Sequence, residues 1–170
     1  ENVAGWTPVT SGTSLSLKDV IWGDGEFVAV GHDDAFVSLI LVSADGETWQ
    51  EVTPTQGVAQ PRALLYTGEA YYMAGNHRYV RGESVGAWTQ VYQSFHSSQL
   101  SFFDLAFDGL NVLTLFDNIE FNQGFPTNIT YPPSAYMTSL DALDGFPEKL
   151  ETKLARVSGR DMLFTGGEFF

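Results

Sequence analysis

Four segments of the chain repeat one pattern, and this internal repetition limits the possible fold more than any other feature. Each segment has a short apolar run, a glycine-containing turn and a second apolar run. The segments align without gaps: DVIWGDGEFVAVG (19–31), ALLYTGEAYYMAG (63–75), DLAFDGLNVLTLF (104–116) and LARVSGRDMLFTG (154–166). Successive copies begin about 40 to 50 residues apart, a period typical of repeat architectures that include propeller blades. We therefore expect repeated copies of one supersecondary unit.

The turn inside each repeat predicts an antiparallel hairpin. Glycine adopts a positive φ at little steric cost, which lets two adjacent strands reverse direction. The turn pairs are Asp24-Gly25, Thr67-Gly68, Asp108-Gly109 and Ser158-Gly159. No segment shows a clear helical stripe, since Gly145 and Pro147 interrupt the nearest candidate, 141–154. The expected structure is all-β.

A second marker closes each unit. It is an aromatic residue followed by two mostly polar residues and a valine: Trp6-Thr7-Pro8-Val9, Trp49-Gln50-Glu51-Val52 and Trp88-Thr89-Gln90-Val91, with a weaker copy at 146–150. The first complete unit then reads as four strands over 19–22, 27–31, 36–42 and 49–52.

These units predict a single β-propeller segment over residues 1–170, built of four-stranded antiparallel blades. The expected blades are 10–54, 55–93, 94–150 and a partial 151–170, with 1–9 as the outer strand of a preceding blade. Known propellers close with about 4 to 8 blades, so about three and a half blades need completion. We expect a longer chain, in view of the missing initial methionine and the apolar last residues, or else a homo-oligomer that closes the ring.

Charge and composition exclude several partners. The chain has 21 acidic and 8 basic side chains and a formal net charge of -13. Such a charge repels nucleic acid and anionic membranes. The chain has no cysteine, so disulfides and thiolate metal sites are excluded. No apolar run approaches the roughly 18 to 20 residues needed to span a bilayer, so no membrane insertion is expected.

The stretch SADGETW follows the third predicted strand of the first unit. In this stretch Asp45 can accept hydrogen bonds from backbone N–H groups, Gly46 permits a left-handed conformation, and Trp49 can pack between sheets. The pattern of Ser43, Asp45, Gly46, Thr48 and Trp49 resembles the Asp-box of sialidase-like (BNR-type) propellers, in the non-enzymatic branch found in bacterial and phage proteins. The resemblance is close over 17–54, fair over 62–92 and loose from 100 onward. It implies a structural turn on the face away from any active site.

Sialidase chemistry is not expected from this chain. The resemblance implies three arginines on a substrate carboxylate, a tyrosine–glutamate nucleophile, an aspartate acid/base and an Arg-Ile-Pro stretch. The chain lacks Arg-Ile-Pro, and Gln60-Pro61-Arg62-Ala63 does not match it. We therefore predict no catalytic residue, no cofactor and no enzyme activity. The alternative is a glycoside hydrolase domain whose catalytic residues lie mostly outside this segment.

Two histidine-containing loops are candidates for a metal site. His32-Asp33-Asp34 and Asn76-His77-Arg78 follow equivalent strands of the first two units, and their side chains could meet a divalent ion if the loops lean together. Neighbouring blades would otherwise hold the two imidazoles too far apart. We interpret both as polar loops and predict no metal site.

Aromatic residues suggest a binding surface. Most must lie in the core, but Tyr79 and Tyr92 are candidates for exposed positions where a ring offers apolar area with a polar group. The insertion 117–134 adds Phe121, Phe125 and Tyr131, and its glycine and prolines predict an irregular loop. Such loops often carry recognition, although this one could instead cap its own blade or contact a neighbouring subunit.

The sequence thus predicts a binding or scaffolding propeller that recognises a glycan or a protein, extracellular or virion-associated, in a phage appendage or on a bacterial surface. A photosystem-assembly type of propeller is a further alternative. A binder should present an aromatic and polar groove. An enzyme should instead present two carboxylates about 5 to 10 Å apart at the central funnel.

Overall fold

The computed structural model describes residues 7–33, 35, 38–55, 58–76, 78–93, 98–107, 109, 111–122, 125–130, 134–139, 148–149, 164–165 and 168–169. Over these ranges the chain forms strands and connecting turns and no helix, so the all-β prediction is confirmed. Accordingly, the described residues contain no helix with the length and apolar character that a membrane crossing requires.

Sheet one contains β1 (Ser16–Gly23), β2 (Glu26–His32), β3 (Ser38–Ser43) and β4 (Gln50–Glu51), antiparallel and in chain order. These strands lie within a few residues of the predicted ones. Asp24 and Gly25 join β1 to β2 with φ values of 50° and 84°. Because both values are positive, the turn is of the type I′ that matches the twist of a two-residue hairpin.

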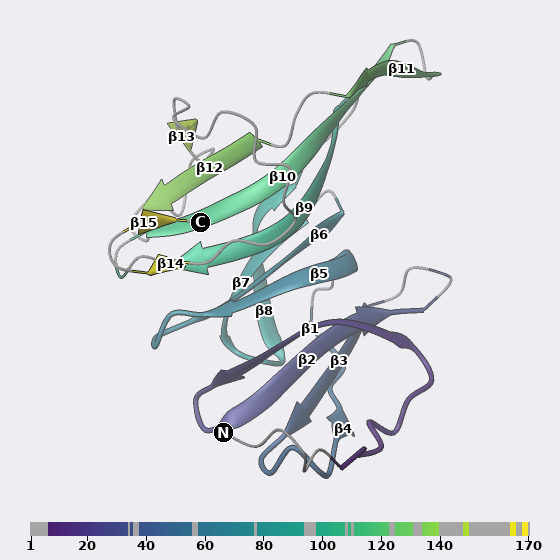
Figure 1. Ribbon diagram of the computed structural model, residues 1–170, viewed down its shortest axis with the longest axis vertical. Coiled ribbons are helices and arrows are strands. Elements are labelled where there is room, and N and C mark those ends of the chain that lie inside the picture. The colour runs from purple at the N-terminus through teal and green to yellow at the C-terminus, as the bar shows by residue number, and fades with distance from the viewer. Residues whose placement is uncertain are drawn as a thin grey trace.

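The remaining long strands contain two further antiparallel runs (Figure 1). Sheet two is β5 (Ala59–Tyr66), β6 (Tyr71–Asn76), β7 (Arg78–Ser84) and β8 (Ala87–Gln93). Sheet three is β9 (Ser98–Phe107), β10 (Asn111–Asn122), β12 (Ser134–Ser139) and β13 (Glu148–Lys149). The pair Asn76 and Ser101 connects the two runs. Two short strands, β14 (Phe164–Thr165) and β15 (Glu168–Phe169), form a separate hairpin.

The three sheets fall inside the predicted ranges 10–54, 55–93 and 94–150. Most of the fourth range, and residues 1–6 of the predicted outer strand, lie outside the described residues. Residues 7–9 are described and are not in a strand. The first strands of the three sheets, β1, β5 and β9, lie side by side (Figure 1). This arrangement is compatible with blades, and the described residues do not form a closed ring.

The insertion 117–134 differs from the prediction, since its first residues continue β10. Its prolines were expected to prevent regular pairing, but β11 (Phe125–Thr130) pairs with the end of β10, with Phe121 opposite Pro126. A bulge between Ile119 and Phe121 adjusts the register. Since β11 pairs on one side only, proline can occupy it without removing a ladder hydrogen bond.

Two apolar layers hold the sheets together. We call the face of each sheet that meets the next sheet its back face, and the opposite face its front face. The back face of sheet one places Val28, Val30 and Ile40, all with no exposed surface, against Tyr71 and Trp88 on the front face of sheet two. Burying each of these aliphatic side chains contributes about 1.5 to 3 kcal/mol.

The second layer repeats this relation one sheet further along. The back face of sheet two contributes Tyr72 and Ala74, and the front face of sheet three contributes Phe102, Leu105 and Val112. Within β5 and β6 the apolar positions alternate between the two layers, as the period of two in a strand requires. Sheet two is therefore buried on both faces, which explains why β6 reads as a continuous apolar run.

Polar groups also connect sheet one to sheet two. The Tyr71 hydroxyl donates to the Gly23 carbonyl oxygen at 2.8 Å, and the Leu64 N–H donates to Asp19 Oδ2 at 2.7 Å. Both acceptors lie on β1, so these bonds fix this edge strand of sheet one against sheet two.

Candidate functional site

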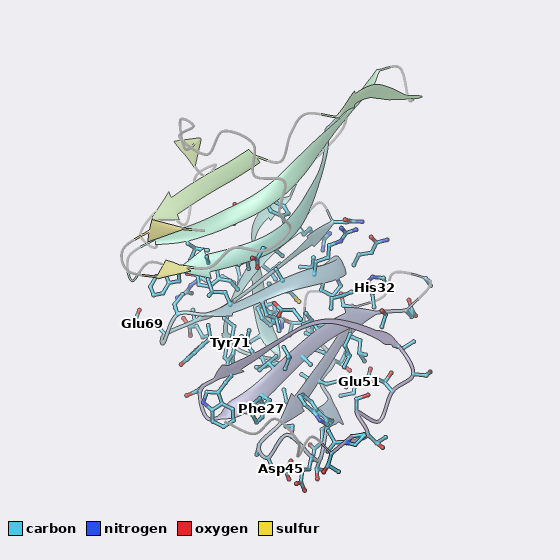
Figure 2. All side chains as sticks on the ribbon, in the orientation of Figure 1. Phe27, His32, Asp45, Glu51, Glu69 and Tyr71 are labelled. Atoms are coloured by element: carbon cyan, nitrogen blue, oxygen red, sulfur yellow. The ribbon has the colours of Figure 1, made fainter. Side chains whose placement is uncertain are left out.

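The antiparallel order gives the molecule two distinct ends. The tight turns β1–β2, β3–β4, β5–β6 and β7–β8 gather at one, which we call the Asp45 end. At the opposite end of the molecule, β2 and β6 end and β3 and β7 begin. We call it the Gln60 end. Figure 2 shows His32 at the Gln60 end, with Asp45 and Glu69 at the other.

The Asp45 turn is built around one carboxylate. Asp45 Oδ1 accepts from the backbone N–H of Thr48 at 2.7 Å and of Glu47 at 2.8 Å, and from Ser43 Oγ at 3.0 Å. Gly46 has a φ of 77°, and its N–H donates to Ser43 Oγ at 2.9 Å. The predicted acceptor role of Asp45 and the left-handed Gly46 are therefore confirmed.

These donors hold the Asp45 carboxyl in its ionised form. The bonds from Thr48, Glu47 and Ser43, in that order of size, keep the pKa of Asp45 below its ordinary value of 3.8. A carboxylate with a lowered pKa is a poor general acid. The geometry thus suits a structural turn.

Trp49 packs in a different place from the one predicted. It was expected between two sheets, but its ring lies beside Ala29, Leu39 and Leu41 on the front face of sheet one. Its indole N–H donates to the Gly46 carbonyl oxygen at 3.2 Å. Side chains alternate between the two faces along β2 and β3, so Ala29 and Leu41 lie on the other face of the sheet from Val28 and Ile40. Trp49 therefore lies on the face turned away from sheet two.

The corresponding turn of sheet two keeps the tryptophan and replaces the aspartate. The Trp88 indole N–H donates to the Val85 carbonyl oxygen at 2.8 Å, as Trp49 does to Gly46. Thr55, from the segment after sheet one, takes part in this turn: its Oγ1 accepts from the Trp88 N–H at 3.1 Å, and its N–H donates to the Gly86 carbonyl oxygen at 3.1 Å. A residue from the connection between sheets one and two therefore satisfies this turn.

An Asp45→Asn variant is expected to melt below the wild type near neutral pH, because asparagine keeps an acceptor oxygen but loses the charge that the donors favour. A pKa that is lowered on folding adds stability above the unfolded value, and this stability is lost as pH falls through the folded value. The difference in melting temperature should therefore close as pH falls below 3.8. The control is Glu47→Gln, which removes one charge from the same turn and leaves Asp45 in place. A difference that stays constant with pH would contradict the assignment.

The Gln60 end holds a polar network around a strained residue. Gln60 has a φ of 51°, in the left-handed region that non-glycine residues seldom adopt. Its Oε1 accepts from Asn76 Nδ2 and from Arg62 Nη2, the latter at 3.4 Å. Residues in such conformations occur preferentially at ligand sites, where the surrounding structure supports the cost.

Further polar contacts lie on neighbouring strands at the Gln60 end. Ser38 Oγ on β3 donates to the Val58 carbonyl oxygen, which connects sheet one to the start of β5. His32 Nδ1 lies 2.9 Å from the Asp33 carbonyl oxygen at the end of β2. Arg78 begins β7 directly after this region. The sequence did not indicate Gln60 as a site residue, because nothing in the stretch Gln60-Pro61-Arg62-Ala63 predicts a positive φ.

The register brings the backbones of Tyr79 and Tyr92 to this same end, and those of Phe121 and Phe125 lie farther out along β10 and β11 (Figure 1). Tyr79 pairs with Tyr92 where β7 begins and β8 finishes. Phe121 and Phe125 lie at the β10–β11 hairpin, beyond the start of β9. Their side chains, and Tyr131 altogether, lie outside the described residues, so their role in binding stays a prediction.

The metal hypothesis gains no support from the described part of the chain. Asp34 and His77 lie outside it, and within it no group of three or more His, Asp or Glu side chains could hold a metal ion.

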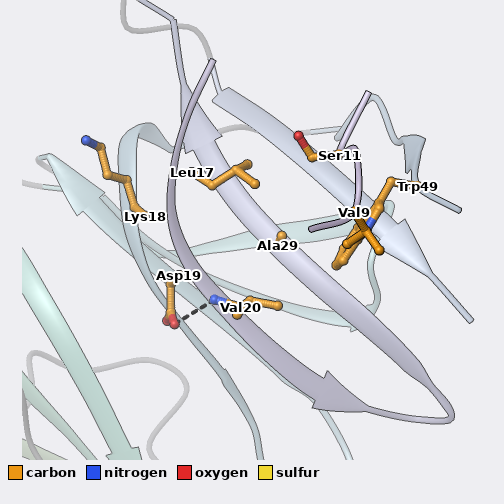
Figure 3. A pocket seen from close by; sticks show the side chains of 8 residues that line it. All are labelled: Val9, Ser11, Leu17, Lys18, Asp19, Val20, Ala29 and Trp49. Atoms are coloured by element: carbon orange, nitrogen blue, oxygen red, sulfur yellow. Dashed lines mark hydrogen bonds between the residues drawn. The ribbon is translucent and has the colours of Figure 1, made fainter. Parts of the chain in front are cut away.

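A groove of about 590 Å³ lies on the front face of sheet one (Figure 3). Its apolar lining is Val9, Leu17, Val20, Ala29 and Trp49, with Ser11, Lys18 and Asp19 beside them. The groove lies on the sheet face itself, away from the polar network of Gln60. Its lining suits apolar packing more than chemistry on a small polar molecule.

Comparison with protein-family models, curated proteins and solved structures found no match to this chain. The resemblance to Asp-box propellers therefore stays a prediction that rests on the sequence.

Proposed function

We propose that this chain is a segment of a β-propeller that acts as a binding or scaffolding module rather than as an enzyme, and that its ligand contacts lie at the Gln60 end. The observation that carries the proposal is the polar network of Gln60, Arg62 and Asn76 around a non-glycine residue with a positive φ. A strained residue supported by side chains from two strands is characteristic of a preorganised binding site.

Two observations support the propeller arrangement. Three runs of four antiparallel strands follow one another along the chain, and the front face of each later sheet packs on the back face of the sheet before it. Their first strands lie side by side, as the inner strands of neighbouring blades do.

The chemistry of the Gln60 end suits a ligand rich in hydroxyl or carbonyl oxygens. Gln60, Asn76, Arg62 and Arg78 carry amide and guanidinium N–H groups, the type of donor that binds such oxygens. Such donors, with aromatic residues on the adjacent strands, fit a glycan or an exposed peptide backbone. A glycan or protein on a phage or bacterial surface is the partner class that we propose, which would make the protein extracellular or virion-associated.

The test is a glycan microarray, followed by calorimetry on the best ligand. Gln60→Gly keeps the positive φ and removes the amide, because glycine accepts this conformation without strain. We expect at least about tenfold weaker binding, or about 1.4 kcal/mol, with an unchanged or higher melting temperature. Arg62→Ala should also weaken binding.

The matched control is Arg81→Ala, which removes the same charge from a surface pair with Glu83 at 3.9 Å. Equal affinity in all three variants would contradict a site at the Gln60 end. Hydrolysis of the bound glycan by the chain would contradict the non-enzymatic role and favour the hydrolase alternative.

A further inference from the structure

The front faces of sheets two and three are covered in the same way. In sheet two, Leu64 and Tyr71 are 3% and 1% exposed beneath the back face of sheet one. In sheet three, the equivalent residues Leu105 and Val112 are 5% and 1% exposed beneath the back face of sheet two. The same repeat positions therefore receive a back face twice.

The front face of sheet one leaves the equivalent positions exposed. Val20 corresponds to Leu64 in the repeat alignment, yet it is 57% exposed. Trp22 corresponds to Tyr66, which is partly buried against the first layer, and it is 56% exposed. Sheet one thus has apolar side chains at the receiving positions, and no sheet among the described residues covers them.

Three aromatic rings have the same arrangement on both front faces. In sheet two they are Tyr66, Tyr71 and Trp88, and in sheet one the equivalent residues are Trp22, Phe27 and Trp49. The centre of the first ring lies 4.6 Å from that of the second on both faces. The centre of the second ring lies 6.5 Å from that of the third in sheet two and 6.4 Å in sheet one. Sheet one therefore already holds its rings as sheet two holds those that a back face covers.

The chain also reaches both faces in the same way. Val52 directly follows the outer strand of sheet one, and it packs in the layer between sheets one and two. Val9 holds the same position in the first tryptophan marker, and it lines the groove beside Trp49 (Figure 3). Because Val52 comes from the sheet that covers sheet two, the equivalent position of Val9 indicates that sheet one is covered by a sheet as well.

We propose that the front face of sheet one receives the back face of a further four-stranded blade, whose outer strand leads into Val9. The occupant is a sheet that presents a row of branched apolar side chains, of the kind that Val28, Val30 and Ile40 present to sheet two. The further blade rests on the propeller arrangement of the proposed function and is independent of ligand binding at the Gln60 end.

A chain with one added repeat tests the proposal. In this tandem chain, a second copy of residues 10–52 replaces residues 1–9, so that its Trp49 and Val52 take the places of Trp6 and Val9. The back face of sheet one covers the three rings of sheet two, so we expect the back face of the added copy to cover the equivalent rings of sheet one. The added sheet should then bury Val20 and Trp22.

Val20→Glu in sheet one, with the added copy left unchanged, should have different effects in the two chains. In the original chain the site is exposed, so the unfolding equilibrium constant should change by no more than about twofold. In the tandem chain the substitution buries a charge, so this constant should rise at least about tenfold. Trp22→Gln should show the same contrast. Thr89→Glu is the matched control, since it places the same charge on an exposed position of β8 and should act alike in both chains.

Equal effects of Val20→Glu in the two chains would overturn the proposal, as would an added copy that a protease removes while the rest of the tandem chain stays intact. Sedimentation velocity of the original chain tests the other occupant. A dimer that Val20→Glu dissociates would place a second copy on this face and would also overturn the proposal.

Tyr71→Ala separates failure of the further blade from failure of the propeller arrangement, because Tyr71 lies between sheets one and two. If Tyr71→Ala destabilises the original chain while Val20→Glu acts equally in both chains, only the further blade is refuted. If Tyr71→Ala leaves the original chain as stable as before, the packing of sheet one on sheet two is refuted, and the further blade with it.

Discussion

A Gly31→Ala variant is expected to lose about 3 kcal/mol or more of its free energy of unfolding. A Cβ atom on Gly31 would overlap the backbone carbonyl oxygen of Ser16 and lie 2.9 Å from the carbon of that group. It would also lie 3.0 Å from the Cα atom of Leu17. The obstacle is backbone, which no side-chain rotation can clear, so β1 must move away from β2. Chemical denaturation measures the loss as a lower midpoint at an unchanged m-value.

Gly86→Ala is the matched control for the cost of the added methyl group. A Cβ atom there would make an ordinary contact, 3.7 Å from Val52 Cγ1. Its effect should stay within about 0.5 kcal/mol. If Gly31→Ala were as stable as Gly86→Ala, the close approach of β1 to β2 at Leu17 and Gly31 would be wrong.

Tyr71→Ala is expected to cost about 3 to 5 kcal/mol, the range for removal of a buried aromatic side chain. Tyr71 is 1% exposed, and its ring lies 4.6 Å from that of Tyr66 and 6.5 Å from that of Trp88. Removing it opens a cavity between sheets one and two. Denaturation monitored by tryptophan fluorescence measures this loss.

The Tyr71 hydroxyl contributes separately. Tyr71→Phe leaves the Gly23 carbonyl oxygen without this donor and should cost about 1 to 3 kcal/mol. Tyr66→Phe is the control, since the hydroxyl of Tyr66 donates to the Gly68 carbonyl oxygen at 3.0 Å in a solvent-exposed hydrogen bond. It should cost less than about 0.5 kcal/mol. Equal losses for the two variants would refute a buried bond between the sheets.

The same hydroxyl predicts the alkaline behaviour of the protein. Burial, aided by the negative charges of Glu26 and Asp24, raises the pKa of Tyr71 from 10.0 to about 12. Its contribution to stability is therefore complete below the unfolded value and is lost as pH rises through the folded value. In Tyr71→Phe this part of the alkaline loss should disappear. An absorbance titration should show one tyrosine that ionises near pH 12 in the wild type and is missing from Tyr71→Phe.

Local patterns predicted the strands and turns well. The Asp24-Gly25 pair specified a turn with two positive φ values, and the stretch from Ser43 to Trp49 specified its own hydrogen bonds. Both features depend on residues close together in sequence, so the residue types and their spacing are enough to predict them. The antiparallel order of each unit followed from the short turns.

Features that depend on distant partners could not be predicted in this way. The placement of Trp49 on the front face depends on which side of sheet one the next sheet covers. The positive φ of Gln60 occurs where the register of β5 against β6 shifts, between Ala59 and Ala63, and Asn76 and Arg62 contact its amide there. The pairing of β11 with β10 depends on an unpaired strand edge, which outweighed the local effect of Pro126.

The proposed propeller requires that sheet one packs directly on sheet two, back face to front face. A Cβ atom on Gly23 would lie 2.6 Å from Cγ and 2.8 Å from Cβ of Tyr66, so the Gly23 α-hydrogens must face the Tyr66 side chain. A nuclear Overhauser spectrum measures this contact directly. We predict strong cross-peaks between the Gly23 α-hydrogens and the Tyr66 side chain, as intense as those between Trp22 and Phe27 within sheet one, whose rings lie 4.6 Å apart. Cross-peaks between Trp22 and Phe27 without any between Gly23 and Tyr66 would contradict the stacking of the sheets.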